Sequence, residues 1–290
     1  TDFYQLTMTA AYFQYNLENN IKEEDDIATF ELFIRKFPKN RNYLIFAGLE
    51  QAIYYLLNAR FTKRTIDFLG NKPVFKKIDS SFFDKYLPNF KFNLDIWAME
   101  EGNYFFPNEP IMRIQGPIIH AQLAETYLLN VINYQTLVAS KASRIRNIAL
   151  DKVLLEFGTR RSHSPLAGVY AARASYIAGF NGTSNVIADI ELGINSTGTM
   201  AHSFVQKFDK EIDSFKTYFD IYDENSILLI DTYDTEKGAE KCAQFGNKIK
   251  GVRIDSGDLI NHAKKVRKIL DEIGCEKVLI VASSDLNEYK

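Results

Sequence analysis

The 290-residue sequence predicts an α/β protein in which an α+β domain precedes a closed α/β barrel. Two observations predict this fold class. Residues 1–116 mix helical and strand patterns without regular alternation. From residue 153 onward, short apolar runs that end in polar residues alternate with helical segments, as in a parallel sheet covered by helices. We therefore predict a domain boundary near residue 117, with the barrel over 117–290.

Composition limits the possible functions. The chain is 46% hydrophobic and 25% charged, which is typical of a globular domain with a large core. A net charge of -2 argues against nucleic acid as the main partner. Cys242 and Cys275 have neither metal-ligand nor disulfide-framework spacing, which fits a reducing compartment. No run approaches the roughly 20 apolar residues that span a membrane. We therefore expect a cytoplasmic location.

The first domain is predicted from alternating periodicities. Residues 1–17 place apolar side chains at helical spacing, with Thr1 or Asp2 as the N-cap. Residues 28–37 alternate apolar and polar side chains, which predicts a half-buried strand, and residues 36–41 form a basic turn. Further helices are predicted over 48–60 and 75–86, and further strands over 92–99, 103–106 and 111–115.

The second domain is predicted to begin with a long helix. Gly116-Pro117 introduces a helical tract to about Ala149, because proline is favoured at a helix start. Gly246 and Gly274 predict later helix ends. An open doubly wound sheet is the alternative fold, although no Gly-x-Gly-x-x-Gly follows a strand. The strands of this part are predicted over 153–157, 185–190, 194–199, 227–230, 251–254 and 278–282.

Polar side chains gather where these predicted strands end. In α/β barrels the carboxyl ends of the strands carry the active site. Here those ends carry Arg160, His202, Asp231, Asp255 and Ser283. The sequence therefore predicts one polar site built from several strand ends.

His202 lies at a predicted junction of strand and helix within residues 198–204. Aromatic and aliphatic side chains follow at helical spacing up to Phe219, so the junction would offer helix-terminal amides near Thr199 and His202. Such amides can bind an anion. A lone histidine is more often structural, so this segment alone does not establish catalysis.

Two further segments suggest anion chemistry. Arg160 and Arg161 follow a strand, where they could bind phosphate or carboxylate, or else pair with a nearby acid. Arg253 and Asp255 alternate with apolar residues and so point to one face of a strand, which is costly unless they are paired or functional. Asp231 ends another buried strand.

The remaining polar candidates receive structural interpretations. Asp258 is expected to cap the following helix. His120, His163 and His262 have no partner pattern and are taken as structural or surface residues. The residues alone thus predict a barrel enzyme with an anion-binding site, whose carboxylates could hold Mg²⁺. The natural substrates would carry phosphate or carboxylate groups.

Five motifs occur in order along the chain. They are residues 1–5 (TDFYQ), 42–49 (NYLIFAGL), 155–161 (LEFGTRR), 198–205 (GTMAHSFV) and 251–259 (GVRIDSGDL). Together they closely resemble the nicotinate phosphoribosyltransferase family. The resemblance implies an irregular, TIM-like α/β barrel of the type II phosphoribosyltransferase kind. It also implies transfer of phosphoribosyl from phosphoribosyl pyrophosphate to nicotinate, giving nicotinate mononucleotide and pyrophosphate with coupled ATP hydrolysis, in a dimer with shared sites.

The resemblance also implies catalytic roles. His202 would be the histidine that ATP phosphorylates. Asp255 and Asp231 would contact the ribose or an Mg²⁺-bound diphosphate and support positive charge that develops at the ribose carbon. Which residues hold Mg²⁺ remains open.

Substrate-binding roles follow from the same motifs. Tyr4, reaching into the neighbouring subunit's site, and Phe157 would sandwich the pyridine ring. Arg253 and Thr199 would hold nicotinate, and Arg160 would bind the substrate phosphates or carboxylate. In addition, the basic turn with Lys39 and Arg41 would reach a partner's phosphates.

Ser184 bears on the choice of substrate. The related nicotinamide phosphoribosyltransferases have an aspartate in the matching segment, where it accepts the amide hydrogens. An acid there would repel the carboxylate of nicotinate, whereas Ser184 can donate a hydrogen bond. Quinolinate phosphoribosyltransferase shares the barrel chemistry, but the motif of residues 1–5 does not belong to it. A catalytically silent nucleotide-binding homologue is the other alternative, and the joint presence of His202, Asp231, Arg253 and Asp255 argues against it. The family's glycine-rich 5′-phosphate loops lie beyond residue 290, so we expect the chain to be incomplete.

Overall fold

The computed structural model describes residues 1–289. The chain divides into two compact units, Thr1–Ser196 and Thr197–Lys290. Each unit has its own apolar core. The units are therefore described separately. The boundary predicted near residue 117 separates an α+β domain from a barrel, and it stays a prediction.

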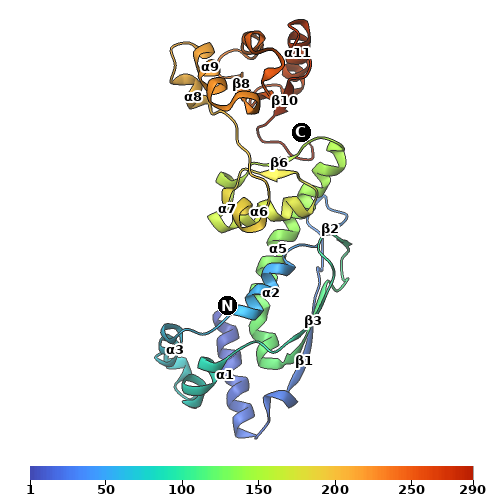
Figure 1. The fold of residues 1–290 in the computed structure, drawn as a ribbon. Coiled ribbons are helices and arrows are strands. Elements are labelled where there is room, and N and C mark those ends of the chain that lie inside the picture. Colours follow the sequence, from blue (N-terminus) through green and yellow to red (C-terminus); the bar gives the residue numbers. More distant parts are fainter. Residues whose placement is uncertain (290) are drawn as a thin grey trace. The chain divides into compact units, whose positions relative to one another are not determined.

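The first unit is built around the long helix α5 (Ile118–Ala149), drawn in green in Figure 1. It packs on an antiparallel sheet of strand order β1-β5-β3. Phe30, Ile114 and Ile96 are in register across this sheet, and Ile114 and Ile96 belong to the apolar core. Pro117 forms the N-cap of α5, as its fixed backbone angle favours. The predicted long helix is thus confirmed, and it forms one wall of the core.

The other elements of the first unit surround this pair of layers. A small antiparallel sheet pairs β2 with β4, and a parallel one pairs β6 with β7. The elements are α1 (Phe3–Glu18), η1 (Glu23–Asp25), β1 (Ile27–Leu32), β2 (Leu44–Ile45), α2 (Leu49–Asn58), α3 (Lys63–Gly70), η2 (Pro73–Phe75), η3 (Phe82–Tyr86), α4 (Leu87–Asn89), β3 (Asp95–Ala98), β4 (Tyr104–Phe105), β5 (Met112–Pro117), β6 (Leu155–Glu156), η4 (Thr159–Arg161), α6 (Pro165–Ile177), β7 (Gly182–Thr183) and α7 (Val186–Leu192).

A half-buried ion network joins three elements of this unit. Arg173 on α6 donates to both carboxylate oxygens of Glu101, at 2.8 and 2.6 Å, and to Glu50 on α2 at 2.6 Å. Glu101 also accepts from the backbone N–H groups of Gly48 and Leu49, where α2 begins. The Arg173 side chain is only 11% exposed. Because the Glu101 carboxylate satisfies donors from both helices, it holds the start of α2 against α6.

This network predicts an acid-sensitive contribution to stability. Burial raises the pKa of the Glu101 carboxyl, but the hydrogen bond and charge of Arg173 outweigh it, so the pKa lies below its ordinary value. A carboxyl whose pKa is lower in the folded state stabilises the fold above its unfolded pKa of about 4.3. That stabilisation is lost as pH falls through the folded value. We expect the thermal unfolding midpoint to fall over this range, and less steeply for Glu101→Gln.

Thermal unfolding followed by circular dichroism from about pH 6 to about pH 3 would measure this effect. Glu18→Gln is the matched control, because Glu18 is an exposed carboxylate at the end of α1. Equal pH dependence in the original protein and in Glu101→Gln would contradict the prediction.

The second unit is a three-stranded parallel sheet of order β10-β9-β8, with α10 and α11 as the two crossovers. Its core includes Leu228, Val252 and Val266, and both cysteines lie in it as free thiols. Figure 1 shows these strands among the helices of the unit. The elements are α8 (His202–Gln206), α9 (Glu211–Tyr222), η5 (Asp223–Asn225), β8 (Ile227–Leu229), α10 (Thr235–Lys241), η6 (Cys242–Lys248), β9 (Gly251–Ile254), α11 (Leu259–Glu272) and β10 (Leu279–Ala282).

The α/β class is confirmed, but residues 1–289 contain no closed sheet. The parallel strands that were expected to close a barrel form one two-stranded and one three-stranded sheet. Part of the difference lies in residues 185–199, which were predicted to give two strands. Residues 186–192 form α7 instead, and the second run contributes an isolated bridge between Thr183 and Ser196.

Local capping explains why α7 is a helix. The side chain of Asn185 accepts from the N–H of Ala188, and Gly193 ends the helix in the left-handed conformation. These are the residue types that favour an N-cap and a C-cap. A short apolar run such as residues 186–192 has no decisive period, so the caps determine its structure.

The segment between residues 60 and 90 also differs from the prediction. Helix α3 was not predicted, although Thr62 caps it by accepting from the N–H of Thr65. The helix expected over 75–86 is replaced by the short turn η2 and a π-helical turn, Phe82–Tyr86. Its aromatic side chains pack into a separate small core with Leu69. None of the helices described for residues 1–289 combines the length and the apolar character needed to cross a membrane.

Candidate active site

Arg253 and Asp255 form the centre of a polar cluster in the second unit. Arg253 lies on β9, and its Nη1 donates to Asp255 Oδ1 at 3.1 Å and to Ser283 Oγ at 3.1 Å. Its Nη2 donates to the carbonyl of Met200 at 3.0 Å. The side chain of Arg253 is 11% exposed and that of Asp255 is 25% exposed. The prediction that both side chains share one face of the strand is confirmed.

Asp231 joins this cluster from the neighbouring strand. It follows β8, and its Oδ2 accepts from the backbone N–H of Asp255 at 2.9 Å and from Ser256 Oγ at 2.5 Å. The other oxygen, Oδ1, is buried and has no partner within residues 1–289. Because a buried carboxylate oxygen usually has a hydrogen bond, Oδ1 is suited to accept from a ligand or to contact a cation.

His202 lies beside the same carboxylates. Its Nε2 is 3.6 Å from Asp255 Oδ2, and its Nδ1 is 3.1 Å from Thr232 Oγ1. A carboxylate beside Nε2 favours the tautomer that carries the proton there, which leaves a lone pair on Nδ1. The hydroxyl of Thr232 can then donate to Nδ1. In that tautomer Nε2 carries the proton and Nδ1 keeps its lone pair.

The helix that follows His202 is shorter than predicted. The amphipathic run divides into α8, which has five residues, and α9, which begins at Glu211. Because α8 still begins at His202, first-turn amides do lie at the junction, and their binding of an anion stays a prediction. Thr199 is half-buried and precedes Met200, whose carbonyl accepts from Arg253.

The cluster could contribute to metal binding through single carboxylates. Within residues 1–289, no three His, Cys, Asp or Glu side chains gather closely enough to hold a metal ion. Mg²⁺ often binds through one or two carboxylates together with substrate phosphates and water. The unpartnered Oδ1 of Asp231 fits that kind of shared site.

The first unit holds a second group of predicted residues. Phe157 and Arg160 follow β6, and Ser184 follows β7, its parallel partner. The N–H of Ser184 donates to the carbonyl of Glu156 at 2.9 Å, which fixes the two strand ends together. Arg160 is exposed and has no ion-pair partner among the residues described.

Tyr4 lies elsewhere in the first unit. Its hydroxyl donates to Glu125 on α5 at 2.5 Å, and this hydrogen bond raises the pKa of Tyr4 to about 12. The turn that carries Arg160 packs on α6, and α6 contacts α5 where the hydroxyl of Tyr134 donates to the carbonyl of Ala167 at 2.9 Å. Glu125 and Tyr134 are separated by about 13 Å along the helix axis. Tyr4 and Ala167 therefore contact different parts of α5.

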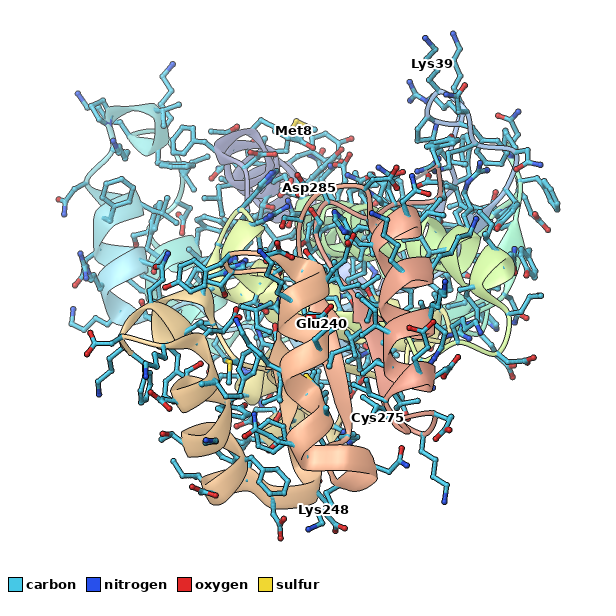
Figure 2. All side chains as sticks on the ribbon, turned by 90° about the horizontal axis from the view of Figure 1, so that it is seen from above. Met8, Lys39, Glu240, Lys248, Cys275 and Asp285 are labelled. Carbon is cyan, nitrogen blue, oxygen red and sulfur yellow. The ribbon has the colours of Figure 1, made fainter. Side chains whose placement is uncertain are left out.

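The basic turn between β1 and β2 is exposed. Lys39 points away from the ribbon, as Figure 2 shows. Arg41 donates to the carbonyl of Asn40 at 3.3 Å. The predicted contact of this turn with a partner's phosphates stays a prediction.

The structure adds residues that the sequence interpretation did not single out. Thr232 and Ser256 each directly follow a predicted strand-end aspartate, so the rule that located Asp231 and Asp255 could have included them. Glu156 and Thr183 hydrogen bond to each other across β6 and β7. That pairing joins distant parts of the sequence, and no local pattern indicates it.

Two family models match the chain and together cover most of it. Residues 1–133 match the nicotinate phosphoribosyltransferase (NAPRTase) N-terminal domain, and residues 153–289 match the nicotinate phosphoribosyltransferase (NAPRTase) family. A nicotinate phosphoribosyltransferase of Bacillus subtilis is 43% identical over 100% of this chain and 58% of its own length. One of Mycobacterium tuberculosis is 41% identical over 100% of this chain and 61% of its own.

The fold agrees with these matches. The crystal structure of human nicotinic acid phosphoribosyltransferase superposes with a TM-score of 0.88 at 29% identity, covering 100% of this chain and 69% of the human one. The chain spans about three fifths of the length of the curated relatives it matches. From the two family models and the similar relatives, we conclude that the chain belongs to the nicotinate phosphoribosyltransferase family.

Proposed function

We propose that the protein transfers phosphoribosyl from phosphoribosyl pyrophosphate to nicotinate, giving nicotinate mononucleotide and pyrophosphate for NAD biosynthesis. Family membership supports the reaction. The observation that carries the proposal is the cluster in which Arg253, Asp255, Asp231 and His202 lie within contact of one another. Such a cluster combines anion-binding and carboxylate groups, which this reaction requires.

Arg253 is suited to bind the carboxylate of nicotinate. A guanidinium has five N–H groups, and Arg253 uses three of them within the second unit. Its Nε is buried without a partner among the described residues. We propose that the remaining N–H groups serve the substrate, together with Thr199. Phe157 would pack against the pyridine ring, and Arg160 would bind phosphate or carboxylate.

The aspartates are suited to the charge that develops during transfer. As the bond from the ribose carbon to pyrophosphate breaks, positive charge develops on the ribose, and nearby carboxylates stabilise it. Asp255 is held in place by Arg253 and Ser283, and Asp231 by Ser256. Mg²⁺, when bound to the diphosphate, would neutralise the leaving group, and Asp231 Oδ1 would be its protein ligand.

ATP coupling is proposed to act through His202. With its proton on Nε2 beside Asp255, the imidazole presents a nucleophilic Nδ1. Attack on the γ-phosphorus of ATP would form an N–P bond, break the bond to the bridging oxygen and release ADP. The hydroxyl of Thr232, now beside Nδ1, would have to turn away. The new negative charge would change the affinity for diphosphate.

The direct test is pyrophosphate release from purified protein, with nicotinate or nicotinamide and with or without ATP. We expect nicotinate to be preferred, because Ser184 places a neutral side chain where an acid would repel its carboxylate. His202→Ala should lose the stimulation by ATP and keep some basal transfer, and His163→Ala is the exposed control. Preference for nicotinamide would contradict the substrate assignment, and stimulation that survives in His202→Ala would contradict the phosphohistidine.

A catalytically silent homologue would behave differently in the same assay. It requires that no pyridine acid yields pyrophosphate and that ATP does not label His202. The three hydrogen bonds and the close His202 contact of the Arg253–Asp255 pair favour an active enzyme. The irregular barrel, the dependence on Mg²⁺ and the cytoplasmic location are also proposals.

We also propose a homodimer in which Tyr4 completes the site of its partner. In its own chain Tyr4 is bonded to Glu125 and is 48% exposed, so its ring is open to another molecule. Mixing two defective variants tests this sharing. Tyr4→Ala and Asp255→Asn should each have weak activity alone. Heterodimers of the two should regain activity, because one of their two sites then contains both an intact Tyr4 and an intact Asp255.

The control is a mixture of Asp255→Asn with Asp231→Asn, two residues that contact each other within one chain. That mixture should regain no activity, because neither subunit then supplies an intact set of aspartates. Failure of the Tyr4→Ala mixture to exceed this control would contradict the shared site.

A further inference from the structure

The carboxylate of Glu156 lies under the turn that carries Phe157 and Arg160. Its Oε1 accepts from the backbone N–H of Gly158 at 2.5 Å, and its Oε2 accepts from the hydroxyl of Thr183 at 2.9 Å. Thr183 is fully buried on β7. Both carboxylate oxygens are thus used inside the protein, and Glu156 connects the turn after β6 to the neighbouring strand.

Gly158 allows this close approach. A Cβ at that position would lie 2.7 Å from Glu156 Oε1, closer than real contacts allow. The backbone of Gly158 is not in the left-handed region, so its lack of a side chain serves space rather than conformation. Any larger residue would push the carboxylate away from the amide.

A second set of contacts ties the same turn to α7. Asn185 is buried, its Oδ1 caps α7, and its Nδ2 donates to Thr159 Oγ1 at 3.3 Å. The N–H of Asn185 also donates to Thr183 Oγ1 at 3.1 Å. Thr183 therefore receives one hydrogen bond from this group and gives one to Glu156. The network joins the segment of Ser184 to the turn of Arg160.

We propose that Glu156 is a positioning residue that fixes the turn of residues 157–161 for binding of the pyridine substrate. The proposal rests on the proposed function for the identity of that substrate. Each oxygen of Glu156 accepts a hydrogen bond inside the protein, and we assign its effect to these contacts with Gly158 and Thr183 rather than to contact with substrate. A misplacement of about 1 Å at such a turn can cost up to about 100-fold in rate.

Two kinds of variant separate geometry from charge. Glu156→Ala removes both acceptors and leaves the Gly158 amide without a partner. Glu156→Gln keeps an oxygen for that amide, and its NH₂ can donate to Thr183 Oγ1, so the geometry can persist. Gly158→Ala keeps the charge but displaces the carboxylate. Positioning predicts that Glu156→Ala and Gly158→Ala behave alike and that Glu156→Gln retains most function.

The experiment combines hydrogen–deuterium exchange of the peptide covering 157–163 with steady-state kinetics. We expect faster exchange in Glu156→Ala and Gly158→Ala, together with a KM for nicotinate raised about 10- to 100-fold and a smaller change in kcat. Glu191→Ala, at an exposed glutamate on α7, is the matched control. It should have the same exchange rate and the same kinetic constants as the original protein.

The outcomes are distinct. Unchanged exchange in Glu156→Ala would overturn the proposal whatever the kinetics. Faster exchange with an unchanged KM would also overturn it, because Glu156 would then be merely structural. If the original protein formed no pyrophosphate from nicotinate, the proposed function would fail, while exchange would still decide whether Glu156 orders the turn. A variant that does not fold is replaced by Thr183→Val, which removes the other contact of the carboxylate.

Discussion

Replacing Arg173 with methionine is expected to lower the free energy of unfolding by about 3–5 kcal/mol, as for other buried ion pairs that lose one partner. The methionine keeps most of the buried aliphatic volume, so the loss comes from the guanidinium. Glu101 would remain 18% exposed without its countercharge. It would keep only the amides of Gly48 and Leu49 as donors, and Glu50 would lose its partner on α6.

Urea unfolding of Arg173→Met, Glu101→Gln and the double variant would measure the coupling. We expect the double variant to lose less free energy of unfolding than the sum of the losses in the two single variants, because each single change already breaks the same contact. Lys63→Ala is the control, since its pair with Asp67 is exposed and should contribute almost nothing. If Arg173→Met changed the free energy of unfolding as little as Lys63→Ala does, the prediction would be contradicted.

The parts of the fold that could be predicted have strong local signals. The long helix α5 begins after Pro117 and continues without a breaker, and α11 begins at the predicted cap Asp258. The run 186–192 was predicted as a strand because an apolar stretch of that length fits either structure. Its helical state depends on Asn185, which also takes part in the long-range contact with Thr159.

The candidate site shows the same division. Alternation along β9 was enough to place Arg253 and Asp255 on one face, and the strand-end rule located Asp231. The contacts of His202 with Thr232 and Asp255 could not be predicted in detail, because they depend on how α8 meets the ends of two strands. The residue types were enough to locate the candidate site, whereas the hydrogen-bond partners of His202 depend on tertiary packing.

Asp255 is the residue on which the most contacts of the site converge. Its Oδ1 accepts from Arg253 and from Ser283, its Oδ2 faces His202, and its backbone N–H donates to Asp231. Its carboxylate therefore orders the guanidinium and lies beside the imidazole, and its backbone N–H holds the neighbouring aspartate. A change at this position should affect substrate binding and catalysis together.

Asp255→Asn is accordingly expected to reduce kcat/KM for nicotinate about 100-fold or more, the scale on which preorganised electrostatic groups act. The new NH₂ must face either Arg253 or His202, so a donor meets a donor or the wrong tautomer is favoured. Arg253, which is 11% exposed, would also lose its countercharge. Kinetics with saturating phosphoribosyl pyrophosphate, together with the thermal unfolding midpoint, would separate lost chemistry from lost folding.

Asp258→Asn is the matched control for this prediction. Asp258 lies three positions further on, is exposed and caps α11 through the N–H of Asn261. Asparagine caps a helix about as well as aspartate, so activity and stability should both be nearly unchanged. If Asp255→Asn kept activity close to that of Asp258→Asn, the carboxylate would not be organising Arg253 and His202. The catalytic role would then have to pass to Asp231, the other carboxylate of the cluster, whose Oδ1 has no partner among the described residues.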